Sequence, residues 1–475
     1  MTVVQVASEA VPFSKTGGLA DVAGALPKAL AARGAKVCLF TPAYRGSAKG
    51  AVEAAKLRVP LAGAELSCRV LRAPLGGADA YLIDHPAFFD RPALYGEGGK
   101  DYADNAERYA FFSRAVLEAC RALKLAPTVF HAHDWQAGLV PALLKTTYKD
   151  EPSVRGAASV FTVHNMGYQG LFPNSAQPVT GLPPAAFSPE GAEYWGKVSY
   201  LKAGLAYADV LTTVSPTHAR EVQTPEYGRG FEGLMRSRAD VLHGVLNGLD
   251  SEAWDPARDR SLPRPYSAKN AAAGKAAAKA ALQKALGLGA APDAFLVGSV
   301  TRLDAQKGVD VALKAVEPLL SAGAQYVLLG SGDPALEKAA KAFAAGHAGR
   351  AAYTSRFDDE LARLIYAGSD AFLMPSRYEP CGLGQLIAMR YGTLPVAVRT
   401  GGLADTVPPH GFLAPAAEVP AVASALAEAA RAFGEPRAWA KRREGAMAPD
   451  RGWGPAAAKY LELYALAEAR VPRPR

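Results

Sequence analysis

With 475 residues, 49% of them hydrophobic, and a formal net charge of +8, the chain exceeds the length over which a single hydrophobic core keeps growing. We therefore expect a globular protein of two domains. The charge is mild for this length and gives little support for a nucleic-acid partner, and no RNA-binding signature or zinc-finger spacing is present. No apolar run approaches the roughly eighteen residues of a membrane span, and the N-terminus does not read as a signal peptide.

The four cysteines are scattered through the chain and form no C-x-x-C pair. They are Cys38, Cys68, Cys120 and Cys381. In a chain of this length, such usage predicts reduced thiols in a cytoplasm rather than a disulfide framework.

The first half of the chain alternates between short apolar runs and amphipathic runs, which predicts strands alternating with helices. Strands are expected at residues 3–7, 36–41, 129–130, 159–163 and 210–214, with antiparallel material between residues 57 and 83. Helices are expected at residues 20–32, 105–123, 138–147 and 197–208.

The second half restarts the same alternation after a polar, proline-bearing segment that ends near Pro265. Strands are expected at residues 295–300, 326–329, 371–374 and 394–398, and helices at residues 383–391, 418–433 and 456–470. The basic residues of the alanine-rich stretch 268–284 are expected on a solvated helix face. This order predicts an α/β protein with two doubly wound parallel sheets. The expected domains are residues 1–243, residues 244–455, and a C-terminal segment 456–475.

The stretch from Met374 to Val407 organises the second half. A buried strand ends at Met374, a polar break carries Glu379, and a helix opens beside Gly382. A second strand then leads into the loop Arg399-Thr-Gly-Gly-Leu-Ala-Asp405. In such a βαβ unit, ligands bind at the carboxyl ends of the strands, and a glycine turn at a helix N-terminus suits a phosphate.

The glycine loop has a twin near the N-terminus, where Lys15-Thr-Gly-Gly-Leu-Ala-Asp21 repeats the sequence of residues 400–405. The repetition favours two similar halves that face each other, with a site in the crevice between them. The alternative is a pair of unrelated βα turns that use glycine for its backbone freedom, and the repeat by itself does not separate the two interpretations.

Two cations follow the first strand of the second half. Arg302 and Lys307 flank the start of a helix, where fixed positive charges can neutralise a diphosphate leaving group. Alone they are compatible with an ordinary surface loop. The nearby Gly330-Ser-Gly332 turn and the Glu379 loop, which also follow strands, favour the functional interpretation.

The run His131-Ala-His133-Asp134 contains metal-ligand residue types, but no second cluster accompanies it. We expect no metal, and we interpret Asp134 as a contact to a sugar hydroxyl or an acceptor. His164 has a similar place after a strand. Cys381 stands at a helix start, where a packing role is favoured over a nucleophile. No G-x-S-x-G elbow, Walker loop or dinucleotide fingerprint is present, so the sequence lacks the motifs that would usually indicate a hydrolase, a kinase or a dehydrogenase.

Seven ordered motifs together resemble one family, the bacterial glycogen synthases and plant starch synthases. They are SEAVPFSKTGGLADV from Ser8, HAHDW from His131, TVHNMGYQG from Thr162, NGLD from Asn247, RLDAQKG from Arg302, SRYEPCGL from Ser376 and RTGGLADTV from Arg399. The resemblance implies the GT-B fold, in which two Rossmann-like domains face each other across a deep cleft and a C-terminal helix returns to the first domain. It also implies transfer of glucose, with retention, from ADP-glucose to the non-reducing 4-hydroxyl of an α-1,4-glucan such as glycogen, without a metal or other cofactor.

The resemblance also implies roles for individual residues. Lys15, Gly17, Gly18, Arg302 and Lys307 would meet the donor diphosphate, and Glu379 would hold the glucose hydroxyls. Further donor contacts are implied at Gly330, Cys381, Gly382 and Leu383. His164 would lie beside the anomeric carbon, Asp21 and Asp134 would line the sugar and acceptor side, and Tyr95 is similar to a tyrosine that packs on the nucleotide base.

Three positions depart from the family pattern. Gln136 replaces a usual histidine, Gly384 replaces a common threonine, and the loop after Val407 is short. None removes an expected phosphate contact, although the short loop leaves the detail of the donor pocket open. The alternatives are a transferase of the same fold that uses UDP-glucose or a small-sugar acceptor, and a catalytically silent glucan-binding protein. The presence of all four charged residues of the motifs, Lys15, Arg302, Lys307 and Glu379, argues against the silent protein.

Overall fold

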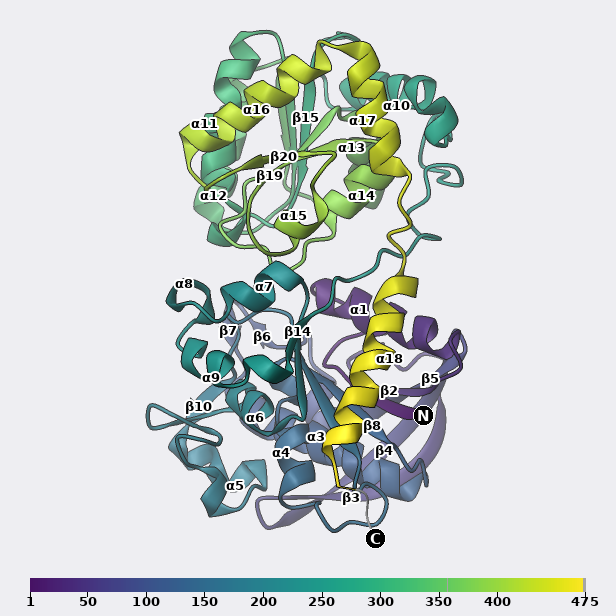
Figure 1. The fold of residues 1–475 in the computed structure, drawn as a ribbon, viewed down its shortest axis with the longest axis vertical. Coiled ribbons are helices and arrows are strands. Elements are labelled where there is room, and N and C mark those ends of the chain that lie inside the picture. The colour runs from purple at the N-terminus through teal and green to yellow at the C-terminus, as the bar shows by residue number, and fades with distance from the viewer. Residues whose placement is uncertain (357, 473–475) are drawn as a thin grey trace. The chain divides into compact units, whose positions relative to one another are not determined.

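The structure is a computed structural model that describes residues 1–356 and 358–472, and it divides into two compact units (Figure 1). The first unit comprises Met1–Gly248 and Trp453–Arg475, and the second comprises Leu249–Gly452. The expected boundary at residue 244 coincides with the end of strand β14 (Leu242–Gly244), which pairs with β13 (Val210–Thr213), so the division falls after Gly248. Residues 473–475 of the expected C-terminal segment lie outside the described residues.

The first unit is built on a nine-stranded sheet of order β14-β13-β9-β8-β1-β2-β5-β4-β3. The seven strands from β14 to β5 run parallel, whereas β4 is antiparallel to both β5 and β3. The remaining bounds are β1 Thr2–Val6, β2 Lys36–Pro42, β3 Val52–Leu61, β4 Ala64–Leu75, β5 Ala78–Asp84, β8 Val129–His133 and β9 Ala158–Val163. The central strands are apolar and buried on both faces, as expected of a parallel sheet covered by helices.

Helices cover both faces of this sheet. On one face α1 packs against the final helix α18, and on the other α3, α4 and α6 form the larger core cluster. The longer helices are α1 Gly18–Ala31, α3 Asn105–Ala122, α4 Leu139–Lys145, α6 Tyr200–Tyr207 and α18 Trp453–Arg470. The shorter ones are α2 Pro86–Phe89, α5 Gln177–Thr180, α7 Pro216–Glu221, α8 Pro225–Gly228 and α9 Glu232–Ser237.

The first unit also carries two small sheets that the sequence did not predict. One has the order β10-β12-β11 and the other pairs β6 with β7. Their bounds are β6 Gly96–Glu97, β7 Lys100–Asp101, β10 Leu171–Pro173, β11 Glu193–Tyr194 and β12 Lys197–Ser199. The prediction of a helix over residues 197–208 is therefore wrong at its start. The helix begins only at Tyr200, because the Ser199 side chain caps it by accepting from the backbone N–H of Lys202.

The second unit contains a six-stranded, fully parallel sheet of order β17-β16-β15-β18-β19-β20. The strands are β15 Leu296–Val300, β16 Gln325–Leu329, β17 Ala351–Thr354, β18 Ala371–Met374, β19 Leu394–Val398 and β20 Phe412–Ala414. Both predictions of sheet type are thus confirmed, and the α/β fold class is correct. The antiparallel material expected between residues 57 and 83 is also confirmed, because β4 pairs antiparallel with both β3 and β5.

The helices of the second unit also lie on both faces of their sheet (Figure 1). One face carries α11 and α16, and the other α10, α13 and α14. The bounds are α10 Ala271–Ala285, α11 Val309–Ser321, α12 Pro334–Gly346, α13 Asp359–Gly368, α14 Gly384–Arg390, α15 Gly401–Thr406, α16 Val419–Phe433 and α17 Pro436–Met447. The expected loop over residues 399–405 is wrong from Gly401 onward, where α15 begins.

The alanine-rich helix α10 corrects a second expectation. Lys275 and Lys279 are each only 5% exposed, so its basic residues do not all lie on a solvated face. The Lys275 ammonium donates to the backbone oxygens of Ala367 and Ser369 and to the hydroxyl of Thr393. Lys279 forms an ion pair with Asp370 at 2.8 Å. The sequence did not indicate that these two lysines are buried, because an alanine-rich composition is also typical of an exposed helix.

Two further findings concern the described residues as a whole. None of their helices is long and apolar enough to cross a membrane. The four cysteines, all among the described residues, are buried and form no disulfide.

Candidate active site

An ion pair at the carboxyl ends of two strands forms the centre of the candidate site in the second unit. The Lys307 ammonium lies 2.6 Å from Glu379 Oε2, and the side chains are only 17% and 7% exposed. The Ser376 hydroxyl donates to the same carboxylate oxygen at 3.0 Å. A buried carboxylate held by one cation and one hydroxyl still has acceptor capacity for the hydroxyls of a ligand.

The backbone after β15 fixes Lys307. The Asp304 carboxylate accepts from the backbone N–H of Lys307 at 3.1 Å and caps the short 3-10 turn that carries the lysine. Gly308 follows with φ of 65°, and a Cβ there would lie 2.2 Å from the Pro375 carbonyl oxygen. Glycine is thus required for the loop after β15 to meet the loop after β18.

Two glycines of α15 hold the Glu379 loop from the other side. The N–H of Gly402 donates to the Glu379 carbonyl oxygen at 3.0 Å. A Cβ on Gly401 would lie 2.0 Å from that same oxygen, and one on Gly402 would lie 2.1 Å from the Cys381 carbonyl oxygen. The glycine pair is therefore needed for close packing against residues 379–381, which is a structural reason for the repeated motif. Cys381 is buried beside it.

The turn between Cys381 and the helix differs from the prediction by a few residues. Gly382 has φ of 77° and lies outside the helix, Leu383 is the N-cap residue, and α14 begins at Gly384. The left-handed backbone at Gly382 turns the chain after Cys381, and the right-handed helix follows two residues later.

The remaining two residues predicted in this unit lie on the loops after β15 and β16. Arg302 is half exposed, with its guanidinium 3.4 Å from Asp304. Gly330 has φ of 154°, and a Cβ there would lie 1.7 Å from the Thr301 carbonyl oxygen, so the two loops meet at the backbone. Arg302, Lys307, Gly330 and Glu379 thus all follow the carboxyl ends of strands in one sheet.

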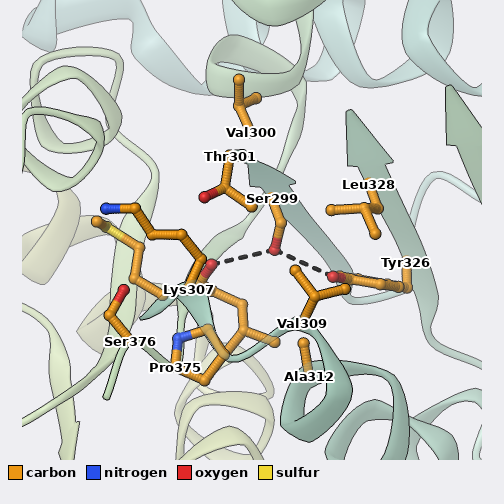
Figure 2. A pocket seen from close by; sticks show the side chains of 12 residues that line it. Ser299, Val300, Thr301, Lys307, Val309, Ala312, Tyr326, Leu328, Pro375 and Ser376 are labelled. Atoms are coloured by element: carbon orange, nitrogen blue, oxygen red, sulfur yellow. Dashed lines mark hydrogen bonds between the residues drawn. The ribbon is translucent and has the colours of Figure 1, made fainter. Parts of the chain in front are cut away.

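A small cavity lies behind this pair, between β15, β16 and β18. Figure 2 shows its lining, in which the Ser299 hydroxyl donates to the Leu373 carbonyl oxygen at 3.0 Å and accepts from the Tyr326 hydroxyl at 3.2 Å. Its volume is about 20 Å³, enough for roughly one water molecule and too small for a sugar. The cavity is therefore a small gap in the packing beneath Lys307 and Ser376. A sugar ligand would have to lie on the solvent side of these two residues.

In the first unit, Asp134 and His164 lie together at the ends of β8 and β9. Asp134 has φ of 55°, and its carboxylate accepts from the backbone N–H of His164 at 2.7 Å. Burial raises the pKa of Asp134 to about 7, against the lowering effect of the His164 hydrogen bond, and the charge of Glu9 raises it further. A left-handed aspartate at a strand end is a strained arrangement of the kind found at functional sites.

The imidazole of His164 is held by a second histidine that the sequence did not assign to the site. Nδ1 of His133 lies 3.0 Å from Nε2 of His164, so one ring donates to the other. Burial lowers the pKa of His164 to about 3, and the neighbouring His218 lowers it further. His164 is therefore neutral at physiological pH, and its ring is not a general acid there.

The first glycine loop is organised by Glu9. Its carboxylate accepts from both the backbone N–H and the hydroxyl of Thr16, the latter at 2.9 Å, and burial raises its pKa. At the rim of the loop, Lys15 forms an ion pair with Asp21 at 2.7 Å. The helix α1 begins at Gly18, so the N–H groups of Gly17 and Gly18 lie at a helix N-terminus.

Tyr95 lies beside this loop. Its hydroxyl is 2.8 Å from the Ser8 hydroxyl, and its ring packs against Tyr109 with centroids 6.2 Å apart. The hydroxyl is thereby engaged within the first unit, and a role in packing on a nucleotide base stays a prediction.

Sequence reasoning missed three supporting residues, Glu9, His133 and Ser376. Each lies inside a quoted motif, so the motifs contained the signal, but their hydrogen bonds span seven, 31 and three residues and follow no regular spacing. Among the described residues, no group of three or more histidine, cysteine, aspartate or glutamate side chains is arranged to hold a metal ion.

Comparisons with known proteins identify the family. Residues 2–237 match the starch synthase catalytic domain, and residues 292–431 match the glycosyl transferases group 1 domain. The chain belongs to the glycogen and starch synthase family. It is 48% identical to the glycogen synthase of Anaeromyxobacter dehalogenans strain 2CP-C, covering 98% of this chain and 99% of the relative. It is 45% identical to the glycogen synthase of Syntrophotalea carbinolica, covering 98% of each.

Solved structures agree with this assignment. The catalytic domain of starch synthase IV from Arabidopsis thaliana, bound to ADP and acarbose, has a TM-score of 0.90 and 33% identity over 98% of this chain and 99% of that one. A sucrose-phosphate synthase from Thermosynechococcus elongatus has a TM-score of 0.63 at 19% identity, with 98% and 99% coverage, which is evidence for the shared fold alone. The predicted GT-B fold, the family and the glycosyltransferase activity are confirmed.

Proposed function

We propose that this enzyme elongates glycogen by transferring glucose from ADP-glucose to the non-reducing 4-hydroxyl of an α-1,4-glucan, with retention at the anomeric carbon. The observation that carries the proposal is the buried Lys307–Glu379 pair after β15 and β18, beside Arg302. The starch synthase that this fold matches at a TM-score of 0.90 is described as bound to ADP and acarbose, an adenine nucleotide and a sugar ligand.

In this proposal the cations act on the leaving group. As the bond between the anomeric carbon and the donor phosphate breaks, negative charge accumulates on the diphosphate. Fixed charges at Lys307 and Arg302 stabilise that charge without reorganising, which is the largest catalytic effect available to such a site. Lys15 and the N–H groups of Gly17 and Gly18 are proposed to contact the same diphosphate, since a helix N-terminus favours anions. Gly330, Gly382 and Leu383 are proposed as backbone contacts of the donor.

Glu379 is proposed to hold the hydroxyls of the donor glucose rather than to attack it. Its Oε2 already accepts from Lys307 and Ser376, which leaves Oε1 as the oxygen for a sugar hydroxyl. Cys381 is proposed to support this turn by packing. The front-face mechanism then follows, in which the departing phosphate takes the proton of the attacking acceptor hydroxyl on the same side of the sugar.

His164 and Asp134 are proposed on the sugar and acceptor side. A histidine with a pKa near 3 is neutral, so His164 would act through its backbone carbonyl, which faces developing positive charge at the anomeric carbon. Asp134 anchors that backbone through the His164 N–H, and Asp21 is proposed to line the acceptor side. No metal or other cofactor is proposed, because the lysine and arginine side chains supply the positive charge that a metal would otherwise bring.

The localisation is proposed to be cytoplasmic, where the four buried cysteine thiols would stay reduced. The remaining alternatives are a UDP-glucose donor, a small-sugar acceptor and a silent glucan-binding protein.

Incorporation of labelled glucose into glycogen, measured side by side with ADP-glucose and UDP-glucose, tests the proposal. We expect incorporation from ADP-glucose and little from UDP-glucose. Incorporation mainly from UDP-glucose would support the glucosyltransferase activity but would show that the donor is UDP-glucose. Glycogen binding without incorporation from either donor would favour the silent protein.

A further inference from the structure

Exposed apolar side chains gather in one segment of the first unit. Among the described residues, six large hydrophobic side chains are exposed, and three of them, Tyr168, Leu171 and Trp195, lie between residues 168 and 195. Single exposed apolar residues are ordinary in globular proteins, whereas a local concentration that includes two aromatic rings indicates a contact surface.

Trp195 occupies an unfavourable position for a tryptophan. It forms the turn between β11 and β12 with Gly196, and the two residues have φ of 50° and 75°. Such two-residue turns favour asparagine or glycine at the first position, because a side chain with a bulky Cβ substituent is disfavoured at positive φ. The indole is 86% exposed, so burial does not compensate for this strain. A strained and exposed aromatic residue points to a function outside the fold itself.

Residues 193–198, here called the Trp195 hairpin, are held in place by contacts with neighbouring elements. The Tyr194 ring packs against Phe231 with centroids 4.6 Å apart. The N–H of Gly196 donates to Glu193 Oε1 at 2.6 Å, and β12 pairs with β10 through Lys197 and Pro173. The indole is therefore presented by an ordered hairpin, which reduces the entropy lost when a ligand binds.

The same small sheet is joined to the loop that carries His164. The backbone N–H of Tyr200 donates to the Gly170 carbonyl oxygen at 3.1 Å, where that loop ends. Phe172 of β10 packs on Trp135, the neighbour of Asp134, with centroids 5.7 Å apart. The turn at Trp195 is separated from Tyr200 by Gly196 and the three residues of β12. β10 lies at the margin of the first unit in Figure 1.

We infer that the Trp195 hairpin, with Tyr168 and Leu171 of the adjoining segment, is a contact surface for a long α-glucan chain. The inference rests on the proposed function, because the occupant is its acceptor, and it adds a binding surface to that function. The apolar C–H face of a pyranose ring stacks on an aromatic ring. Lys197 within the hairpin and Asn174 beside it are both exposed and offer hydrogen bonds to sugar hydroxyls. A single indole flanked by polar side chains fits a polysaccharide better than the broad apolar core of a protein interface.

Substitution at the turn separates stacking from folding. Trp195→Asn removes the indole and places a residue there that the turn prefers, so its thermal midpoint should equal or exceed that of the wild type. We expect its KM for glycogen to rise roughly fivefold or more, the scale of one lost aromatic contact. Its retardation in native gels containing glycogen should fall. With maltotriose, which has only three glucose units, KM should change less than twofold. Trp195→Phe should restore most of the glycogen affinity.

Val52→Thr is the matched control, because Val52 is an exposed apolar residue on β3, away from this sheet, and we expect it to behave as the wild type. An unchanged KM and gel retardation in Trp195→Asn would overturn the inference. A change in oligomeric state by size-exclusion chromatography, without an effect on glycogen, would overturn it in favour of a protein contact. If the wild type transferred glucose to no acceptor, the proposed function would be refuted instead. Retardation in glycogen gels would then still test whether the Trp195 hairpin binds glucan.

Discussion

The contact between Lys307 and Glu379 joins residues 72 positions apart and carries the largest predicted effect at the scale of single residues. We expect Lys307→Ala and Glu379→Ala each to lower kcat by roughly a hundredfold or more, because fixed charge that stabilises a transition state is lost. Initial rates of labelled glucose transfer from ADP-glucose at saturating glycogen measure this effect.

Lys314→Ala is the control for Lys307→Ala, since Lys314 is an exposed lysine of α11 that follows the same loop. It should keep wild-type kcat. Near wild-type turnover in both site variants would refute the assignment of the site, and a covalent glucosyl adduct on Glu379 detected by mass spectrometry would refute the front-face mechanism.

Individual site residues were predictable where a polar side chain follows a buried strand. Lys307, Glu379, Asp134 and His164 all fit that rule, since the carboxyl ends of parallel strands share one edge of a sheet. Glu9 was not predictable in this way. Its contact with Thr16 depends on the path of a loop, and no periodicity records such a path.

At the scale of elements, the loop after β15 depends on Gly308. Gly308→Ala introduces a Cβ at φ of 65° and only 2.2 Å from the Pro375 carbonyl oxygen. We expect a loss of stability of about 2 kcal/mol or more, together with a lower kcat, since Lys307 precedes this residue. Thermal unfolding and rate measurements check both effects.

Gly346→Ala makes the same chemical change at the C-terminal end of α12, where a Cβ would meet nothing within 4 Å. It should leave kcat unchanged and raise stability slightly, because alanine favours the helix. Equal behaviour of the two glycine variants would contradict the argument for Gly308.

Helix α10 makes stability depend on pH through Lys275. Burial lowers the pKa of Lys275 from 10.5 to about 7, partly opposed by Asp370, while Arg443 and Lys279 lower it further. Between these two values the unfolded chain binds more protons than the fold, so this residue adds stability as pH rises and loses it as pH falls toward 7. In Lys275→Met that dependence is absent.

Urea unfolding at about pH 7 and about pH 9.5 tests this difference. The wild type should gain free energy of unfolding relative to Lys275→Met as pH rises, by a few kcal/mol at most. Lys284→Met, at an exposed position of the same helix, should track the wild type. A constant difference between wild type and Lys275→Met at the two pH values would contradict the lowered pKa.

The alternation of strands and helices was predictable because buried parallel strands are continuous apolar runs. The small sheets were not, because β10, β11 and β12 have only three, two and three residues, too few for a period to show. Helix α15 was read as a loop since it opens with Gly401-Gly402, residues that ordinarily break helices. Close packing against residues 379–381 outweighs that preference.

At the scale of the whole molecule, the length of the chain and the alternation of strands and helices that restarts in the second half predicted two units. The grouping of the last helix with the first unit followed from family resemblance rather than from any local pattern. Helix α18 packs against α1 and β9, residues more than 250 positions earlier in the chain. Contacts at such separations leave no trace in periodicity, so hydrophobic patterning alone predicts the helix and not its partner.

That long-range packing includes two buried polar contacts of the Tyr464 hydroxyl of α18. One is with Nδ1 of His131 at 2.7 Å, and the other is with Nε2 of Gln5, which donates to the hydroxyl at 3.4 Å. Nε2 of His131 is in turn 2.6 Å from the Thr162 hydroxyl. Tyr464→Phe removes a single oxygen and leaves Nδ1 of a fully buried imidazole without that partner. We expect a loss of roughly 1–3 kcal/mol in the stability of the first unit, the cost of an unsatisfied buried polar group. Differential scanning calorimetry measures this loss.

Leu466→Ala, at a position of the same helix that is 37% exposed, should change stability much less than Tyr464→Phe does. Because His131 is separated from Asp134 by only two residues, Tyr464→Phe should also lower kcat/KM for glycogen by a few-fold, while Leu466→Ala should not. If Tyr464→Phe were as stable and as active as the wild type, the last helix would contribute to the first unit through apolar packing alone, and the polar contact to β8 would carry no weight in holding the ends of β8 and β9 in place.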